Sequence, residues 1–287
     1  MREFYSMAQT LAFLNMKGGV GKTTMAVNIA YYLSMIKKNR VLVVDLDPQY
    51  NATQYMVDTD NNPQYVNGER PTVFDIMSLK GFSYESIIDG KKKHVINSVE
   101  LKDVALPLWT EGNAKLDLIP GTIHLINLEM AGRGVEHKLQ NFIQKIKNAY
   151  EYILVDCPPT FSVFLLSGIL ACDSYLIPVK PDPLSVLGVP LLESVIEYYS
   201  ETFGKVIEPK GIVFTMVRDT RMMSNVISGL KQTSSGSRYI FENYSRNCTY
   251  YAEASKQHVP LFKHYYARYY GHARDMENIV NELLRLF

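Results

Sequence analysis

The segment from Asn15 to Thr24 reads Asn-Met-Lys-Gly-Gly-Val-Gly-Lys-Thr-Thr, a spacing of glycine, lysine and hydroxyl side chains that suits phosphate binding. Glycines let successive backbone N–H groups turn towards phosphate oxygens, and the start of the following helix adds a partial positive charge. In such a loop Lys22 reaches the β- and γ-phosphates of a nucleotide, and the Thr23 hydroxyl ligates Mg²⁺. The predicted phosphate-binding residues are Lys17, Gly18, Gly19, Val20, Gly21, Lys22, Thr23 and Thr24.

The loop departs at one position from the general pattern Gly-x-x-x-x-Gly-Lys-Ser/Thr, because Met16 stands where the first glycine is expected. A second lysine, Lys17, follows Met16. Lys17 cannot readily fold back onto the phosphates that Lys22 already neutralises, so its charge is best used on a nucleotide held by a second copy of the chain. The sequence therefore predicts a dimer that forms around bound nucleotides.

Acidic residues follow two other apolar runs, Val41–Val44 and Tyr152–Val155, at the point where each run ends. In a parallel sheet these ends share one edge, which is where ligands of open α/β sheets bind. Phosphoryl transfer to water needs a positioned water, a metal ion and neutralised charge, with little covalent work by the protein. We expect Asp156 to hold Mg²⁺ through a water, and Asp45 to support the loop that follows its own strand.

Strand-length apolar runs alternate with helix-compatible stretches along the chain. Continuous apolar runs suit strands that are buried on both faces, and the alternation predicts a doubly wound α/β fold with a mostly parallel sheet and helices on both faces. The predicted strands are Leu11–Met16, Val41–Val44, Tyr152–Val155, Tyr175–Val179 and Gly211–Met216. The predicted helices are Thr23–Ile36, Lys138–Tyr150, Phe161–Ala171 and Leu184–Phe203.

Two segments fall outside this alternation. Residues from Asn51 to about Leu116 are polar and rich in Asn, Asp, Gly and Lys. We interpret them as an insertion at the ligand-binding edge of one domain that spans residues 1–287. The segment from about Tyr265 to Phe287 has apolar residues at the spacing of one helix face and predicts a terminal helix packed on the sheet. The insertion includes the run Lys91, Lys92 and Lys93, and the apolar residues of the terminal helix are Met276, Ile279, Val280, Leu283 and Leu284.

The composition indicates an ordinary globular protein. Of the 287 residues, 47% are hydrophobic and 21% are charged, which is enough apolar material for a sizeable core. Thirty Lys and Arg against 29 Asp and Glu leave a formal charge of +1, so a polyanion must be bound by a local patch. Three widely spaced cysteines give no disulfide framework and favour a reducing compartment. Without a signal peptide or a membrane-length apolar run, the expected location is the cytoplasm.

The phosphate loop resembles that of the ParA/MinD ATPases, whose P-loop carries the same additional lysine in a deviant Walker A motif. Val44–Thr53, with the sequence Val-Asp-Leu-Asp-Pro-Gln-Tyr-Asn-Ala-Thr, is very similar to switch I of the plasmid and chromosome partition ATPases. Ile153–Pro159 looks like their Walker B strand. Weaker matches extend the likeness over nearly the whole chain, at residues 116–120, 177–179, 211–216 and 253–255.

This resemblance implies an ATPase with Mg²⁺ as cofactor. It implies that Lys17 crosses to the nucleotide bound by a partner subunit, and that Asp47 orients the attacking water near the metal. It also implies adenine as the base, held by the loops Lys180–Pro183 and Met216–Arg218, which follow the last two predicted strands. The residues assigned in this way are Lys17, Lys22 and Asp47 to catalysis, Thr23, Asp47 and Asp156 to the metal, and Asp182 and Met216 to the base.

Within this family the chain is most similar to Soj-like partition ATPases. That likeness implies an ATP-dependent homodimer that binds double-stranded DNA without sequence preference, at the nucleoid, under stimulation by a centromere-binding ParB-like protein. From Gly211 to Phe287 there are ten Lys and Arg against six Asp and Glu, and clustered cations suffice to bind the DNA backbone. Only 16 residues precede Lys17, so we do not expect operator-specific repression. The candidate DNA-binding residues are Arg218, Arg221, Lys231 and Arg246.

A MinD-like membrane-positioning ATPase is an alternative, because the chain ends in Asn-Glu-Leu-Leu-Arg-Leu-Phe. Helices that lie on a membrane surface usually carry Lys and Arg on their polar face. From Asp275 to Phe287 there is one base, Arg285, against three acidic residues, so membrane binding is not expected.

A bacterial tyrosine kinase is a second alternative, suggested by four tyrosines close together near the end of the chain. Their i, i+4 spacing is more typical of a packed helix face than of a phosphorylation site. Nitrogenase iron-protein relatives share the loop but bridge a cluster with cysteines, and this chain has no cysteine before Cys157. The four tyrosines are Tyr265, Tyr266, Tyr269 and Tyr270.

Overall fold

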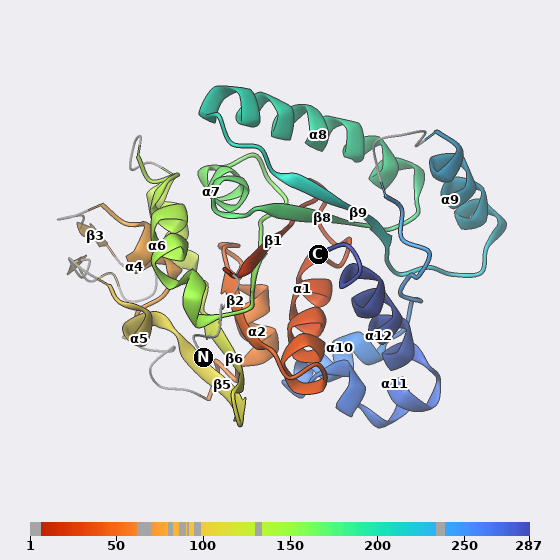
Figure 1. Cartoon of the computed structure of the whole chain (residues 1–287), viewed down its shortest axis with the longest axis horizontal. Helices are drawn as coiled ribbons and strands as arrows, with labels where there is room; N and C mark the ends of the chain where they lie inside the picture. The colour runs from red at the N-terminus through yellow and green to blue at the C-terminus, as the bar shows by residue number, and fades with distance from the viewer. Residues whose placement is uncertain are drawn as a thin grey trace, which may run out of the picture.

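A seven-stranded sheet in the order β5-β6-β2-β7-β1-β8-β9 forms the centre of the computed structural model (Figure 1). The structure describes residues 7–61, 70–79, 83–85, 90, 92–94, 99–129, 134–233 and 239–287. Every neighbouring pair in this sheet is parallel except β5 with β6, so the predicted α/β fold with a mostly parallel sheet is confirmed. The strands are β1 Gln9–Phe13, β2 Arg40–Asp45, β5 Leu106–Glu111, β6 Ala114–Ile119, β7 Tyr152–Asp156, β8 Ser174–Val179 and β9 Glu208–Phe214; β3 Ser83–Glu85 and β4 Lys92–His94 form a separate antiparallel pair.

The five predicted strands lie next to one another as β2, β7, β1, β8 and β9. Sequence patterning missed β5 and β6 because polar residues interrupt them. In β6, Lys115 and Asp117 form an ion pair at 2.8 Å, and the Tyr150 hydroxyl donates a hydrogen bond to Asp117. The turn between β5 and β6 contains Gly112, whose φ of 60° lies in the left-handed region that favours glycine.

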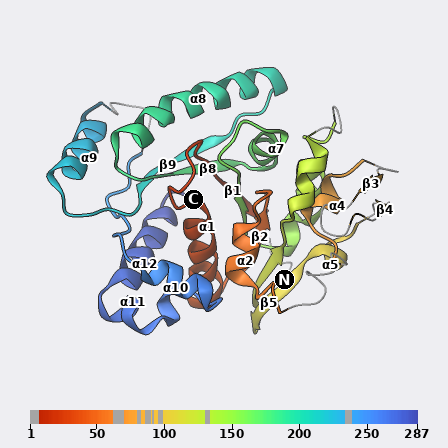
Figure 2. The same cartoon turned by 180° about the vertical axis from the view of Figure 1, so that it is seen from behind.

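Helices cover both faces of the sheet, as Figures 1 and 2 show from opposite sides. Each layer of helices buries its own set of apolar side chains against the sheet. One layer contains α1 Lys22–Tyr31, which continues into a π-helical turn at Tyr32–Ile36, α2 Asn51–Met56, α10 Tyr250–Lys256, α11 Tyr265–Tyr269 and α12 His272–Leu283. The other contains α4 Val73–Met77, α6 Lys138–Ile146, α7 Val163–Ala171 and α8 Pro183–Phe203. The remaining helices are α5 Leu101–Val104, α9 Arg221–Thr233 and the 3-10 turns Ile123–Leu128, Lys147–Ala149 and Leu261–Lys263.

The predicted terminal helix is α12, and its apolar face is buried. Met276, Ile279, Val280 and Leu283 are all inaccessible to solvent, and Leu284 packs against the same cluster. The core therefore already occupies the face that a membrane anchor would need. Among the helices of the described residues, none is long and apolar enough to cross a membrane.

The predicted insertion is joined to the main fold at both ends. At its start, α2 packs against α1, and near its end β5 forms the antiparallel edge of the main sheet. Val73, Phe74 and Met77 of α4 are buried in the core beside α6. Of the lysine run, Lys92 and Lys93 lie in β4. Lys91 lies outside the described residues.

Candidate active site

The loop between β1 and α1 is fixed at both ends by buried side chains. Asn15, 2% exposed, donates from Nδ2 to the Pro178 carbonyl at 2.8 Å and accepts the Lys17 N–H on Oδ1 at 2.8 Å. The Thr215 hydroxyl donates to the Val20 carbonyl at 2.7 Å. Segments at the ends of β8 and β9, far away in the sequence, thus anchor the loop at both ends.

The start of α1 is built to receive an anion. Gly21 caps the helix in the left-handed region, at a φ of 84°, and no side chain caps its N–H groups. Lys22 is buried, and its Nζ lies 3.3 Å from the Lys17 carbonyl. Burial lowers the pKa of Lys22, although Asp156 and Asp47 raise it. A buried cation beside uncapped helix N–H groups matches the charge of a phosphate chain.

Two carboxylates face each other across adjacent strands at the end of the sheet. Asp45 ends β2 and is in register with Asp156, which ends β7. Asp156 is 1% exposed; its Oδ2 accepts the Thr23 hydroxyl at 2.7 Å, while its Oδ1 has no hydrogen-bond partner among the described residues. An orphaned, buried carboxylate oxygen beside a threonine hydroxyl fits a hard divalent cation such as Mg²⁺. The predicted metal residues Thr23 and Asp156 are therefore brought together, and Asp47 lies close enough to shift the pKa of Asp156.

Asp45 and Asp47 shape the loop that follows β2. Asp45 is fully buried and accepts both the Thr53 N–H at 2.8 Å and the Thr53 hydroxyl at 2.7 Å. Burial and the charge of Asp156 raise the pKa of Asp45 to about 8. Asp47 accepts the Gln49 N–H at 2.8 Å, and its carboxylate lies close enough to the phosphate loop to raise the pKa of Lys22.

Asp156→Asn is expected to stabilise the nucleotide-free protein at pH 8. Burial raises the pKa of Asp156 to about 7, against about 3.8 in an unfolded chain. Between these two pKa values the folded state binds more protons than the unfolded state. The contribution of Asp156 to the free energy of unfolding therefore falls as pH rises from about 4 to 8. Asparagine removes the uncompensated charge, and we expect a gain of roughly 1–3 kcal/mol at pH 8 that shrinks towards pH 5. Urea unfolding of both proteins at pH 5 and pH 8 measures this gain in the free energy of unfolding. A less stable variant at pH 8 would contradict the interpretation of Asp156 as an uncompensated buried carboxylate.

Lys17 is held within its own chain in this structure. Its Nζ donates to Asp182 Oδ1 and to Ser185 Oγ, each at 2.9 Å. Burial alone would raise the pKa of Asp182, but the hydrogen bonds from Lys17 and Ser185 hold it below its ordinary value. Asp182, which we expected near the base, also caps α8 by accepting the Ser185 N–H. Met216, the other base candidate, lies beside Gly21 and has a left-handed φ of 53°.

The comparisons with known proteins agree with this geometry. The sequence matches the AAA domain family over residues 8–208, more than half of the chain. It is 30% identical over 215 residues to the chromosome-partitioning ATPase Soj of Treponema pallidum, covering 75% of this chain and 74% of Soj. The chain belongs to the ParA/MinD-type P-loop ATPases. It is also 32% identical over 197 residues to an uncharacterized protein of Methanocaldococcus jannaschii, covering 67% of this chain and 66% of that protein.

The solved structure of McdA from Cyanothece in complex with ATP shares the fold of this ParA/MinD-type ATPase. The TM-score is 0.74 at 22% identity, over 97% of both chains. This likeness shows the fold, while the family match and the likeness to Soj make the chain a ParA-family ATPase, a nucleotide-hydrolysing P-loop enzyme.

Sequence reasoning missed residues that position the site of this ParA/MinD-type ATPase. Gly121 donates its N–H to the Thr53 hydroxyl, and a Cβ at this position would lie 2.8 Å from Asp45 Cγ. Thr215 and Ser185 anchor the loop and Lys17 as described above. The glycine two residues after Ile119, where β6 ends, was the one available signal, because only glycine permits this close approach.

The candidate DNA-binding residues differ in their surroundings. Arg218, Arg221 and Lys231 are exposed and form no ion pair within the described residues. Arg246 instead pairs with Asp275, from Nε at 2.7 Å and Nη2 at 3.1 Å, and Nη2 also donates to the Tyr270 carbonyl. Arg246 thus links residues of the C-terminal helices, although its side chain is also exposed to solvent. Arg238, another of the ten cations counted in this part, lies outside the described residues.

The four tyrosines near the C-terminus are exposed, so the prediction that they form a packed helix face was wrong. Tyr265, Tyr266, Tyr269 and Tyr270 are 63%, 52%, 72% and 53% exposed. Ala267 is the residue of α11 that faces the core. The helix spans only five residues, so one small side chain completes its buried face and the tyrosines point outward.

Proposed function

We propose that this chain is a ParA-type partition ATPase that segregates plasmid or chromosome DNA. In this proposal ATP with Mg²⁺ drives formation of a sandwich dimer, the dimer binds double-stranded DNA without sequence preference, and a centromere-binding ParB-like protein stimulates hydrolysis. The protein would work in the cytoplasm, at the nucleoid. The observation that carries the proposal is the meeting of Lys22, Thr23 and the unpartnered Oδ1 of Asp156 at the uncapped start of α1.

The site residues divide the chemistry of hydrolysis between them. Lys22 and the N–H groups of Gly18 to Thr24 neutralise and orient the phosphates. A bound Mg²⁺ would be held by Thr23, and by Asp156 through water, and would supply charge neutralisation at the phosphates. Asp47, held on a loop whose next residues include the left-handed Tyr50, would accept a hydrogen bond from the attacking water. This arrangement requires no covalent intermediate with the protein.

Lys17 links the nucleotide to dimerisation in this proposal. Its ammonium is bound to Asp182 and Ser185, which begin α8, and it must leave them to reach a nucleotide across a two-fold axis. The same end of α8 carries an exposed leucine row formed by Leu184, Leu187 and Leu191, with exposures of 72%, 71% and 54%. An apolar row that starts beside Lys17 supports a subunit interface on this face.

Duplex DNA binding is expected to depend steeply on salt and on the exposed cations of α9. With ATP and Mg²⁺ present, a labelled 20-base-pair duplex should bind regardless of sequence. Each phosphate contact should add about −0.9 to the log-log salt slope, so Arg221→Gln and Lys231→Gln should each make it shallower by about one unit. Fluorescence anisotropy from low to moderate salt measures the slope.

The matched control for this experiment is Lys37→Gln, which changes an exposed lysine located just before β2. It should leave the salt slope unchanged. No duplex binding at low salt, or equal binding by the ADP-bound protein, would refute the partition proposal. Binding to anionic vesicles in place of DNA would favour the MinD-like alternative.

A further inference from the structure

A continuous aromatic surface lies on α10, on α11 and at Tyr270, which directly follows α11. We call it the tyrosine surface. The rings of Tyr250 and Tyr270 are nearly parallel, with centroids 5.9 Å apart at 2°, and Tyr250 also stacks with Tyr266 at 6.0 Å. Tyr265 stacks with Tyr269 at 6.4 Å and 15°. Edge contacts at 5.2 Å and 5.0 Å join these stacks into one cluster. Its members are Tyr250, Tyr265, Tyr266, Tyr269 and Tyr270.

Contacts of the buried side of α11 fix the orientation of the tyrosine surface. The His264 side chain caps α11 by accepting the Ala267 N–H, and its Nε2 lies 3.2 Å from Glu253 on α10. Ala267 is fully buried. Four aromatic side chains more than half exposed on one turn of helix form an unusual apolar patch on a soluble domain, and a patch of this kind marks a binding surface.

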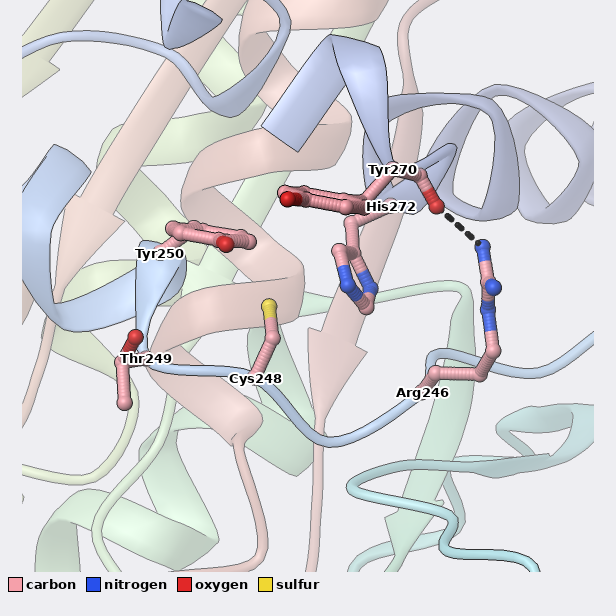
Figure 3. Close-up of a pocket in the computed structure, with 6 residues that line it drawn as sticks. All are labelled: Arg246, Cys248, Thr249, Tyr250, Tyr270 and His272. Atoms are coloured by element: carbon pink, nitrogen blue, oxygen red, sulfur yellow. Dashed lines mark hydrogen bonds between the residues drawn. The ribbon is translucent and has the colours of Figure 1, made fainter. Parts of the chain in front are cut away.

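A hollow of about 430 Å³ lies beside the tyrosine surface (Figure 3). Figure 3 shows the Cys248 thiol pointing towards the rings of Tyr250 and Tyr270, with the His272 ring beneath Tyr270. His272 is 9% exposed, and its Nδ1 lies 3.8 Å from Asp275 Oδ2. The hollow thus offers an aromatic wall. Its lining residues are Arg246, Cys248, Thr249, Tyr250, Tyr270 and His272.

Exposed cations surround the tyrosine surface. Lys263, Arg268 and Arg274 are exposed and have no ion pair in the part of the chain that the structure describes. Among the nearby acids, Asp275 pairs with Arg246, whereas the exposed Glu253 lies 3.2 Å from His264 and Glu277 forms no ion pair with a described residue. Glu282, on the same helix as Asp275, accepts from Tyr239 and Asn243. An anionic partner that also presents flat apolar groups fits this combination.

We propose that the tyrosine surface and its hollow bind single-stranded DNA. Unpaired bases stack on exposed aromatic rings, and the phosphates between them contact the flanking cations. The bases of a duplex already stack on each other and cannot use the rings in this way. A helix that lies on a lipid surface needs an extended apolar face of residues such as Leu, Phe or Trp, whereas α11 spans five residues and exposes only tyrosines and Arg268. This binding activity is separate from the duplex binding proposed above, although Arg246 borders both regions.

The test uses the full chain and a fluorescein-labelled dT20 strand, followed by anisotropy at low salt with and without ATP and Mg²⁺. The double variant Tyr265→Ala/Tyr269→Ala should weaken dT20 binding by at least roughly five- to a hundredfold, which is the range expected for the loss of a single base stack. Tyr265→Trp/Tyr269→Trp should restore binding, because it keeps the stacking surface. Arg268→Gln should reduce the salt slope by about 0.7, the value for one phosphate of a single strand.

Tyr198→Ala is the matched control, since Tyr198 on α8 is 63% exposed, as Tyr265 is. It should leave dT20 binding unchanged, and thermal unfolding should show that all variants fold. The proposal is overturned by absent dT20 binding at low salt, or by an equal loss of duplex binding in the tyrosine double variant. Tighter binding of U20 RNA, or binding of anionic vesicles that the tyrosine variant abolishes, would also overturn it.

Discussion

Lys22→Ala is expected to abolish ATP binding, whereas Asp47→Ala is expected to keep ATP binding and stop turnover. Lys22 is the buried cation of the phosphate loop, so its loss weakens the binding of ATP itself in the ground state. Removing one partner of a buried charge pair costs about 2–5 kcal/mol, which is roughly thirtyfold or more in affinity. Asp47 would act on the attacking water, and its loss should lower turnover by about a hundredfold or more.

Nucleotide-binding titration and phosphate release on both variants measure these effects. Lys37→Ala serves as the control, because it removes an exposed lysine from the far end of the helical segment that begins at Lys22. It should bind and hydrolyse ATP as the unaltered protein does. Unchanged hydrolysis in Asp47→Ala would remove Asp47 from the mechanism and leave Asp45 or Asp156 to position the water.

ATP with Mg²⁺ is expected to convert the protein into a dimer, and Leu187→Asp is expected to prevent this. Leu187 is the centre of the leucine row, and a charge there would have to be buried in the interface without a partner. We expect dimerisation to weaken by about a hundredfold or more, while ATP binding to the monomer stays within a few fold. Light scattering of the Asp47→Ala protein, which should hold ATP unhydrolysed, measures the mass with ATP and with ADP.

Val206→Asp is the control for the dimer experiment. Val206 is 83% exposed but lies beyond the other end of α8, so a charge there should leave dimerisation unchanged. A protein that stays monomeric at saturating ATP would contradict the sandwich dimer. Dimerisation that persists in Leu187→Asp would instead exclude the leucine row from the interface.

The phosphate loop could be predicted because its function lies in consecutive residues. Asn15 to Thr24 supply the glycines, the lysine and the hydroxyl in one stretch, and the flanking apolar runs predict the strand and the helix. The terminal helix was also predictable, since its buried face repeats with the period of an α-helix. In both cases the residues that carry the prediction are close together in the sequence.

The contacts that tune the site could not be predicted from the sequence. Lys17 meets Asp182 across 165 residues, and Gly121 meets Thr53 across 68. Polar and acidic residues are common in loops, so nothing in the local sequence marks these partners. The exposure of Tyr265 and Tyr269 was mispredicted for a related reason: their i, i+4 spacing shows that they share a helix face but not whether the core covers that face.

The sequence by itself determined the family, the phosphate loop and five adjacent strands of the sheet, because hydrophobic period and motif spacing act over neighbouring residues. Only the tertiary structure decided that Asp156 keeps an unpartnered oxygen, that Lys17 is bound within its own chain, and that α11 presents its tyrosines to solvent. These properties depend on which distant segments pack together. Strand order brings β2, β7 and β1 side by side, and so places the carboxylates beside the loop.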